Sequence, residues 1–152
     1  MTDRFLVVVD DSAAALHAAR VAVDLAAAAG ARLTLVTVVE DHVLDARLSA
    51  AAIPDAASRR ARGAVAMVSR VATMADRQGV AAETEVLSGH GAEQVLAAVG
   101  RCGADLIVVA REPRLPAGSR MAPVNVEHLL EFADVPVLVV PPAPKRLHQE
   151  AP

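Results

Sequence analysis

Short apolar runs rich in Val, Leu and Ile alternate along the chain with longer segments whose apolar residues recur every three or four positions. Continuous runs of the first kind are typical of strands that a sheet buries on both faces. Segments of the second kind predict amphipathic helices. The strands predicted from the continuous runs span residues 5–9, 33–39, 104–109 and 136–140, and residues 81–87, which alternate in polarity, predict a further strand. The predicted helices lie between Ser12 and Gly30, over residues 59–78, over residues 91–102 and over residues 126–133.

This alternation predicts an α/β fold, because a strand, a helical crossover and the next strand form a parallel unit. With 152 residues the chain fits one domain, which we expect over residues 1–142, followed by a flexible tail at 143–152. The expected architecture is a doubly wound, three-layer domain with a five-stranded parallel sheet. Ligands bind such sheets beyond the carboxyl ends of the strands. Residues 10–12, 89–91 and 110–124 therefore form the candidate site.

The second predicted helix is rich in arginine. Its apolar spacing indicates a buried face made of Val65, Val68, Val71 or Ala72, and Ala75. The arginines mostly fall off that face and are most simply read as a solvated surface; they are Arg59, Arg60, Arg62, Arg70 and Arg77.

Charge and composition argue against several classes of function. The net charge of -3 and the content of two Phe with no Tyr or Trp make nucleic-acid binding a poor hypothesis, since neither a basic surface nor stacking rings are available. No stretch approaches the roughly 20 apolar residues of a membrane span. The start of the chain has no pattern of a signal peptide, so we expect a cytoplasmic protein without membrane contact.

Candidate chemistry is sparse. Lys145, in the tail, is the one lysine, so the fold offers no lysine for a phosphate loop or a Schiff base. Cys102 is the one cysteine and is expected to be a small core residue in a helix. The five histidines show no ligand spacing, so no metal site is expected.

Two motifs invite comparison with known sites. Asp10 and Asp11 follow the first strand like the magnesium-binding pair of phosphorelay receiver domains, but the phosphate-accepting Asp and the later Lys of receivers are missing. Gly89-His90-Gly91 stands near a dinucleotide fingerprint, yet Gln94 occupies its third glycine position. A tight turn from strand to helix is the preferred interpretation of these glycines. His90 lacks a nucleophile or acid partner at a telling position.

Five segments together resemble the universal stress protein family: residues 5–12 (FLVVVDDS), 31–39 (ARLTLVTVV), 89–93 (GHGAE), 104–109 (ADLIVV) and 134–141 (DVPVLVVP). The resemblance implies a fold like that of the adenine nucleotide alpha hydrolases, with sheet order 3-2-1-4-5, and frequent dimerisation. Some members of the family bind ATP or AMP and others do not. By resemblance, Asp10 matches a residue that contacts adenine, and Val39 matches a backbone contact to the nucleotide.

The family's phosphate-binding pattern is Gly, two residues, Gly, nine residues, then Gly with Ser or Thr. At these places the chain has Ala110, Pro113, Pro123 and Val124. Glycine lets backbone amides approach phosphate oxygens closely, whereas proline has no amide hydrogen and valine has no hydroxyl. The spacing is kept and the chemistry is lost.

A rearranged loop is the alternative. Gly118 and Ser119 would then take over the phosphate contacts, with charge supplied by Arg111, Arg114 or Arg120.

The last predicted strand indicates a partner. Pro136, Val137, Leu138, Val139 and Val140 form an apolar strand at the expected edge of the sheet, where unpaired backbone groups need a cover. The resemblance implies that the same strand of a second copy pairs with it across a two-fold axis. The competing explanation is that the tail from Pro141 folds back over this edge.

The leading functional hypothesis is a non-catalytic, dimeric stress regulator that acts through protein contacts, with a regulatory protein as a further partner and with ATP binding lost. The alternative is an ATP or AMP sensor that uses Asp10, Val39 and the rearranged loop. An enzyme ranks last because no nucleophile, base or metal cluster is evident, although weak nucleotide hydrolysis stays open.

Overall fold

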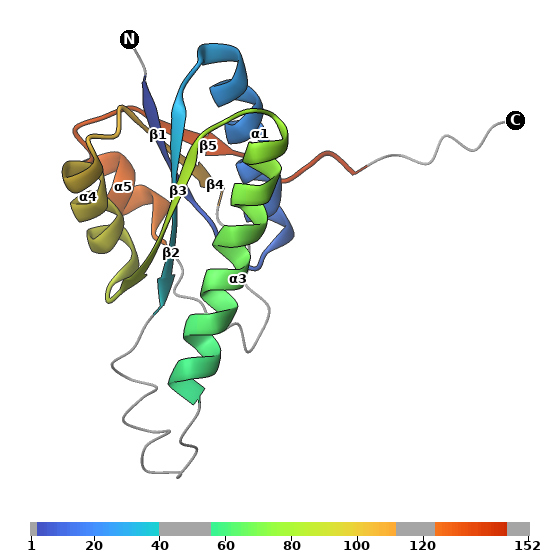
Figure 1. The fold of residues 1–152 in the computed structure, drawn as a ribbon. Coiled ribbons are helices and arrows are strands. Elements are labelled where there is room, and N and C mark those ends of the chain that lie inside the picture. The colour runs from blue at the N-terminus through green and yellow to red at the C-terminus, as the bar shows by residue number, and fades with distance from the viewer. Residues whose placement is uncertain (1–2, 40–55, 112–123, 146–152) are drawn as a thin grey trace, which may run out of the picture.

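A computed structural model describes residues 3–39, 56–111 and 124–145 of the chain. The sheet contains β1 (Arg4–Val8), β2 (Arg32–Val39), β3 (Ala82–Ser88), β4 (Leu106–Ala110) and β5 (Val137–Val140). The helices are α1 (Ala13–Ala29), α3 (Ala56–Arg77), α4 (Gly91–Cys102) and α5 (Val126–Phe132). Every pairing is parallel and the order is β3-β2-β1-β4-β5, so the predicted three-layer α/β fold is confirmed. Figure 1 shows α1 and α3 on one face of the sheet and α4 and α5 on the other.

The central strand β1 is buried on both faces, as its uninterrupted apolar sequence predicts. Phe5 and Val7 belong to the core layer under α1 and α3, whereas Leu6 and Val8 belong to the layer under α4 and α5. Residues on a strand alternate between faces, so one apolar run supplies both layers. Among the described residues no helix combines the length and the apolar character needed to cross a membrane.

The first helix packs closely on the sheet because its inward face consists mainly of alanine. Ser12 caps its start, since the Ser12 Oγ accepts a hydrogen bond from the Ala15 amide at 3.0 Å. Gly30 ends it in the left-handed conformation with φ of 68°. The inward residues are Ala14, Ala15, Ala18, Ala19, Ala22, Val23 and Ala26.

The prediction that Val65 belongs to the buried face of α3 is wrong. Val65 is 51% exposed, and Ala64 is buried in its place. The buried line runs through Ala64, Val68, Val71 and Ala75, whose steps of four, three and four residues keep to one side of a helix. Val65 lies about 100° around the axis from Ala64 and so leaves that side.

The arginines of α3 lie where the sequence predicts them. Arg59, Arg62, Arg70 and Arg77 are exposed, whereas the side chain of Arg60 lies outside the described part of the chain. Cys102 is half-buried and packs against the core layer under α4 and α5.

The carboxylate of Asp105 ties the start of β4 to the start of β1. Its Oδ2 accepts hydrogen bonds from the backbone amides of Asp3 at 2.8 Å and of Arg4 at 3.0 Å, while the Asp105 amide donates to the Arg4 carbonyl at 2.8 Å. The two bonds from Asp3 and Arg4 hold the pKa of the Asp105 carboxyl below its ordinary value. These three hydrogen bonds hold the starts of the two central strands side by side.

Asp105→Asn is expected to lower the thermal midpoint at neutral pH. The folded protein lowers the pKa of this group, so its contribution is present above the ordinary carboxyl range and is lost as the pH falls below about 4. Melting curves from pH 7 down to acid should therefore show the variant and the wild type converging. Asp76→Asn, which changes an exposed carboxylate on α3, is the control and should follow the wild type. A gap between Asp105→Asn and the wild type that stays constant with pH would contradict this account.

Candidate functional site

The carboxyl ends of β1 to β4 lie together at one end of the sheet, here called its carboxyl edge, which is the lower end in Figure 1. Asp10 follows β1, Val39 ends β2, Gly89 follows β3 and Ala110 ends β4. The parallel fold therefore brings residues 10–12 and 89–91 to the same end of the sheet as Ala110, where the third predicted segment begins. Of the residues expected to hold phosphate, Pro113, Arg114, Gly118, Ser119, Arg120 and Pro123 lie outside the described residues.

Asp10 is part of the start of α1. Its Oδ1 accepts a hydrogen bond from the Ser12 amide at 2.7 Å, and Ser12 in turn caps the helix. Asp10 is half-buried, while Asp11 is exposed. One oxygen of the Asp10 carboxylate thus orders the turn, and the other has no hydrogen bond with the described residues.

Val39 is buried at the end of β2, with 6% of its surface exposed. Its carbonyl accepts a hydrogen bond from the Gly89 amide at 3.2 Å, so the ladder between β2 and β3 continues to the edge of the sheet. The carbonyl of the residue that the family resemblance assigns to a backbone contact therefore already has a partner within the chain.

Gly89 makes the tight turn that the sequence predicts. Its φ is 126°, a region that other residues rarely adopt. A Cβ at this position would stand 3.1 Å from the Gln94 Nε2, because the Gln94 side chain lies across the turn. His90 caps α4 with its backbone alone and is exposed, and it makes no side-chain hydrogen bond at the cap. The geometry gives His90 no partner for acid–base catalysis among the described residues.

Ala110 ends β4 in the core, and the exposed Arg111 follows it. Ala110 is 6% exposed, and the Arg111 amide donates to the Val140 carbonyl of β5 at 2.8 Å. The first position of the phosphate pattern is thus a buried core residue. The amide that follows it pairs with a neighbouring strand.

Val124 ends the loop on the other side. It is half-buried and packs against the core layer under α4 and α5. Asn125 then caps α5, since its Oδ1 accepts from the His128 amide at 3.2 Å, and Glu127 places a carboxylate in the first turn. A negative charge there compensates the helix dipole and repels a phosphate.

β5 is an apolar edge strand. Val137, Leu138 and Val139 are half-buried and Val140 is buried. The β4 ladder uses the carbonyls of Pro136 and Val140, because Ile107 and Arg111 donate to them at 3.0 and 2.8 Å. Strand residues alternate in direction, so the amides and carbonyls of Val137 and Val139 point away from β4, out of the sheet.

A family model of the universal stress proteins matches residues 1–141. The chain belongs to the universal stress protein family. The sheet order that the resemblance implies is the order observed. No curated protein sequence matches the chain.

Solved universal stress proteins have the same fold. A family member from Burkholderia pseudomallei is 28% identical, with a TM-score of 0.65 over 93% of this chain and 97% of the other. UspA from Lactobacillus plantarum is 25% identical, with a TM-score of 0.70 over 91% and 97%. An Arabidopsis thaliana family member with AMP bound is 13% identical, with a TM-score of 0.64 over 97% of each chain, and at that identity it supports the fold alone. Two others were solved with cAMP and with dAMP.

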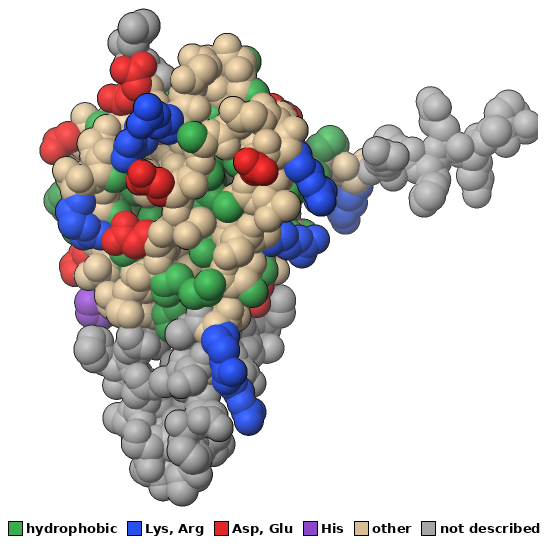
Figure 2. All heavy atoms as spheres, viewed as in Figure 1, with side chains coloured by type: hydrophobic (Ala, Val, Ile, Leu, Met, Phe, Trp, Pro, Cys, Tyr) green, Lys and Arg blue, Asp and Glu red, His purple; other side chains and the backbone are tan. Residues whose placement is uncertain are grey.

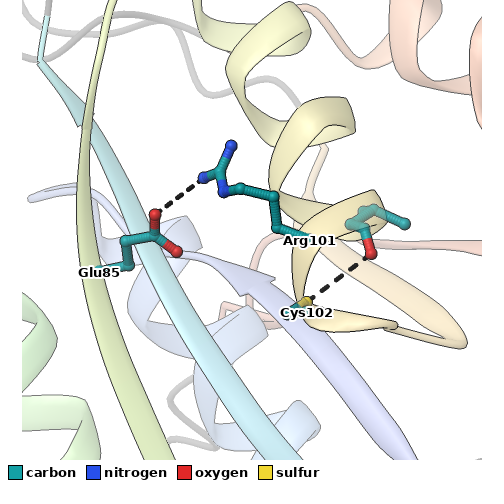
Figure 3. A network of polar contacts seen from close by, with 4 residues as sticks. Glu85, Arg101 and Cys102 are labelled. Carbon is teal, nitrogen blue, oxygen red and sulfur yellow. Dashed lines mark hydrogen bonds and ion pairs between the residues drawn. The ribbon is translucent and has the colours of Figure 1, made fainter.

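The universal stress protein also has a cavity that sequence reasoning missed. It measures about 520 Å³ at the amino edge of the sheet and is lined by Asp3, Arg4, Gly30, Arg32, Cys102, Gly103 and Asp105. Arg4 forms an ion pair with Glu83 at 3.5 Å, and Figure 3 shows the nearby pair of Arg101 and Glu85 at 2.8 Å. The Cys102 thiol points to the Val99 carbonyl at 3.9 Å. The helix-ending glycines were the sequence signal for this edge.

Metal ligation has no support in residues 3–39, 56–111 and 124–145. No three His, Cys, Asp or Glu side chains there lie close enough together to hold an ion.

Gly89→Ala and Gly100→Ala should change stability in opposite directions. Gly89 has positive φ and contacts Gln94, so alanine is expected to cost about 1–3 kcal/mol. Gly100 is an exposed residue of α4 with open space at its Cβ, where alanine should add about 0.5–1 kcal/mol. Urea denaturation of both variants measures the difference. Equal effects of the two substitutions would contradict the assigned turn.

Proposed function

We propose that this universal stress protein is a non-catalytic, dimeric regulator that acts through protein contacts and has lost ATP binding. The observation that carries the proposal is the apolar edge strand β5, whose outward backbone groups pair with none of the described residues and lie beside apolar side chains. The further partner would be a regulatory protein in a stress response. The proposal has two parts, which rest on different regions. The dimer rests on the edge strand β5, and the loss of nucleotide rests on the residues at the carboxyl ends of the strands.

The two edges of the sheet differ in a way that favours pairing at β5. The other edge strand, β3, carries Glu83 and Glu85, and such charges discourage a second chain from pairing. β5 has no charged residue. On the adjoining helix α5, Leu130 and Phe132 are 57% and 56% exposed. Apolar side chains next to an open ladder are typical of an interface between two copies.

Loss of ATP binding is supported by what replaces the phosphate contacts. Ala110 is buried, Val124 packs against the core, and Glu127 brings a negative charge to the start of α5. At the adenine end, Asp10 and the Val39 carbonyl each have a partner within the chain. The carboxyl edge thus uses for its own structure several groups that a nucleotide would need.

Val139→Pro is expected to convert a dimer into a monomer. The amide of Val139 points out of the sheet, so proline removes a bond to the second copy and leaves the β4 ladder intact. Light scattering should give twice 15.7 kDa for the wild type and 15.7 kDa for the variant. Leu138→Pro is the control, because the amide of Leu138 faces β4, and this variant should lose folded structure instead.

A wild-type mass of one chain at all working concentrations, or an unchanged dimer in Val139→Pro, would overturn this proposal.

The alternative function is a nucleotide sensor. It is favoured by the relatives solved with AMP, cAMP and dAMP, and by the second Asp10 oxygen, which has no hydrogen bond from the described residues. The sensor would use Asp10, Val39 and the rearranged loop with Arg111, Arg114, Gly118, Ser119 and Arg120.

Calorimetry with millimolar ATP and magnesium separates the two functions. The proposed regulator should give no heat beyond that of dilution. The sensor predicts binding of micromolar or tighter affinity that weakens in Asp10→Asn, a change that keeps an oxygen for the Ser12 amide. Such binding would reject the loss of ATP and leave the dimer proposal standing, since β5 lies at a different edge.

A further inference from the structure

The exposed side of α3 carries a row of arginines. Arg59 and Arg77 are eighteen residues apart, which is about five turns, so both point the same way. Arg70 lies within about 20° of that direction, and Arg62 lies beside the row. All four side chains are exposed. The row is about 27 Å long. In Figure 2, blue side chains project beside the course of α3 and from its lower end.

These charges have little compensation nearby. The helix has five arginines and one acidic residue, Asp76. Arg70 and Arg77 have no acidic residue three or four positions away within the helix, and no ion pair joins Arg59, Arg70 or Arg77 to the described residues. The first turn contains no acidic residue and contains Arg59, although a helix dipole favours negative charge there. The chain as a whole nevertheless has more acidic than basic residues.

The residues between the arginines have small side chains, so the helix surface there has no large projections. Gly63, Ala66, Ser69 and Thr73 line it, and the Thr73 hydroxyl donates to the Ser69 carbonyl at 3.0 Å. A ligand can therefore lie along the helix and reach each guanidinium. Arginine forms paired hydrogen bonds with phosphate oxygens, which a simple positive charge does not.

We propose that the arginine row formed by Arg59, Arg70 and Arg77 binds a linear phosphate polymer, inorganic polyphosphate. Nucleic acid fits this surface less well, because α3 has no aromatic side chain for stacking and no amide side chain between the arginines to read a base. A membrane fits less well because Asp76 and Asp24 lie near the Arg77 end of the row, and a flat anionic surface would meet them too. A single chain of phosphates is narrower than a membrane, so it can follow the arginine row without covering Asp76 and Asp24.

The net charge of -3 limits where a polyanion could bind this protein. The protein as a whole repels a polyanion, so attraction must come from a local cluster of charge. Binding should also be strongly salt-dependent, because each arginine that meets a phosphate releases a counterion from the polymer.

The test is fluorescence anisotropy with end-labelled inorganic polyphosphate at a series of salt concentrations, using the full chain. The triple variant Arg59→Gln, Arg70→Gln and Arg77→Gln should weaken binding roughly tenfold or more. Its plot of log affinity against log salt should be shallower by roughly 0.7 for each arginine replaced, the value for single-stranded polyanions. The control triple, Arg20→Gln, Arg32→Gln and Arg101→Gln, has the same net charge and removes exposed arginines of other elements, and it should bind like the wild type.

Circular dichroism establishes that both triple variants are folded. No binding of polyphosphate by the wild type would overturn the proposal, and so would an equal loss of affinity in the two triples. Tighter binding of single-stranded DNA, or of vesicles rich in phosphatidylglycerol, would overturn the assignment to polyphosphate. Retained dimer mass and unchanged ATP calorimetry in the variants keep this result separate from the proposed function.

Discussion

The pairing of β1 with β2 on one side and β4 on the other is the interaction on which the rest of this structure depends. Val7 of β1 is fully buried, and it pairs with Leu35 and with Val108. A strand in this position has both ladders satisfied and both faces covered, so helices must lie on the two sides of the sheet. All five strands then run in one direction, and their carboxyl ends gather at one edge.

Sheets of this class bind ligands at that edge. Here several backbone and side-chain groups at the edge form hydrogen bonds within the chain. The Asp10 carboxylate orders the start of α1, the Val39 carbonyl accepts from the Gly89 amide, and the Arg111 amide donates to the Val140 carbonyl. Each bond replaces water on a group that would otherwise be open. A nucleotide at this end of the sheet would have to share these groups with the fold, which supports the proposed loss of ATP binding.

The surfaces argue for binding elsewhere on the molecule. The two sheet edges have opposite chemistry, acidic at β3 and apolar at β5, and the exposed side of α3 is basic. The proposed homodimer and the proposed polyphosphate complex use separate surfaces, so one need not exclude the other.

Patterns in the amino-acid sequence were enough to locate the helices and strands and to predict a parallel sheet. Four strands were readable from continuous apolar runs and one from alternation, and Ser12, Gly30 and Gly89 marked where helices and turns begin and end. The resemblance to universal stress proteins supplied the sheet order, which local patterns do not contain. Some element ends matched the prediction, as both ends of α4 did, and others shifted by up to three residues, because hydrogen bonding between neighbours sets the last paired residue.

Which distant residues meet depends on packing in three dimensions. Val65 fits the apolar pattern of α3, yet packing selected Ala64, since the inward direction depends on how the helix lies on the sheet. The partners of Val39 and Asp105 come from the fold, and so does the packing of Val124 against the core, whereas Asp10 meets Ser12 within one local turn. Sequence spacing fixes the direction of a side chain along its own element. The three-dimensional neighbours decide whether that side chain serves the core, the surface or a site.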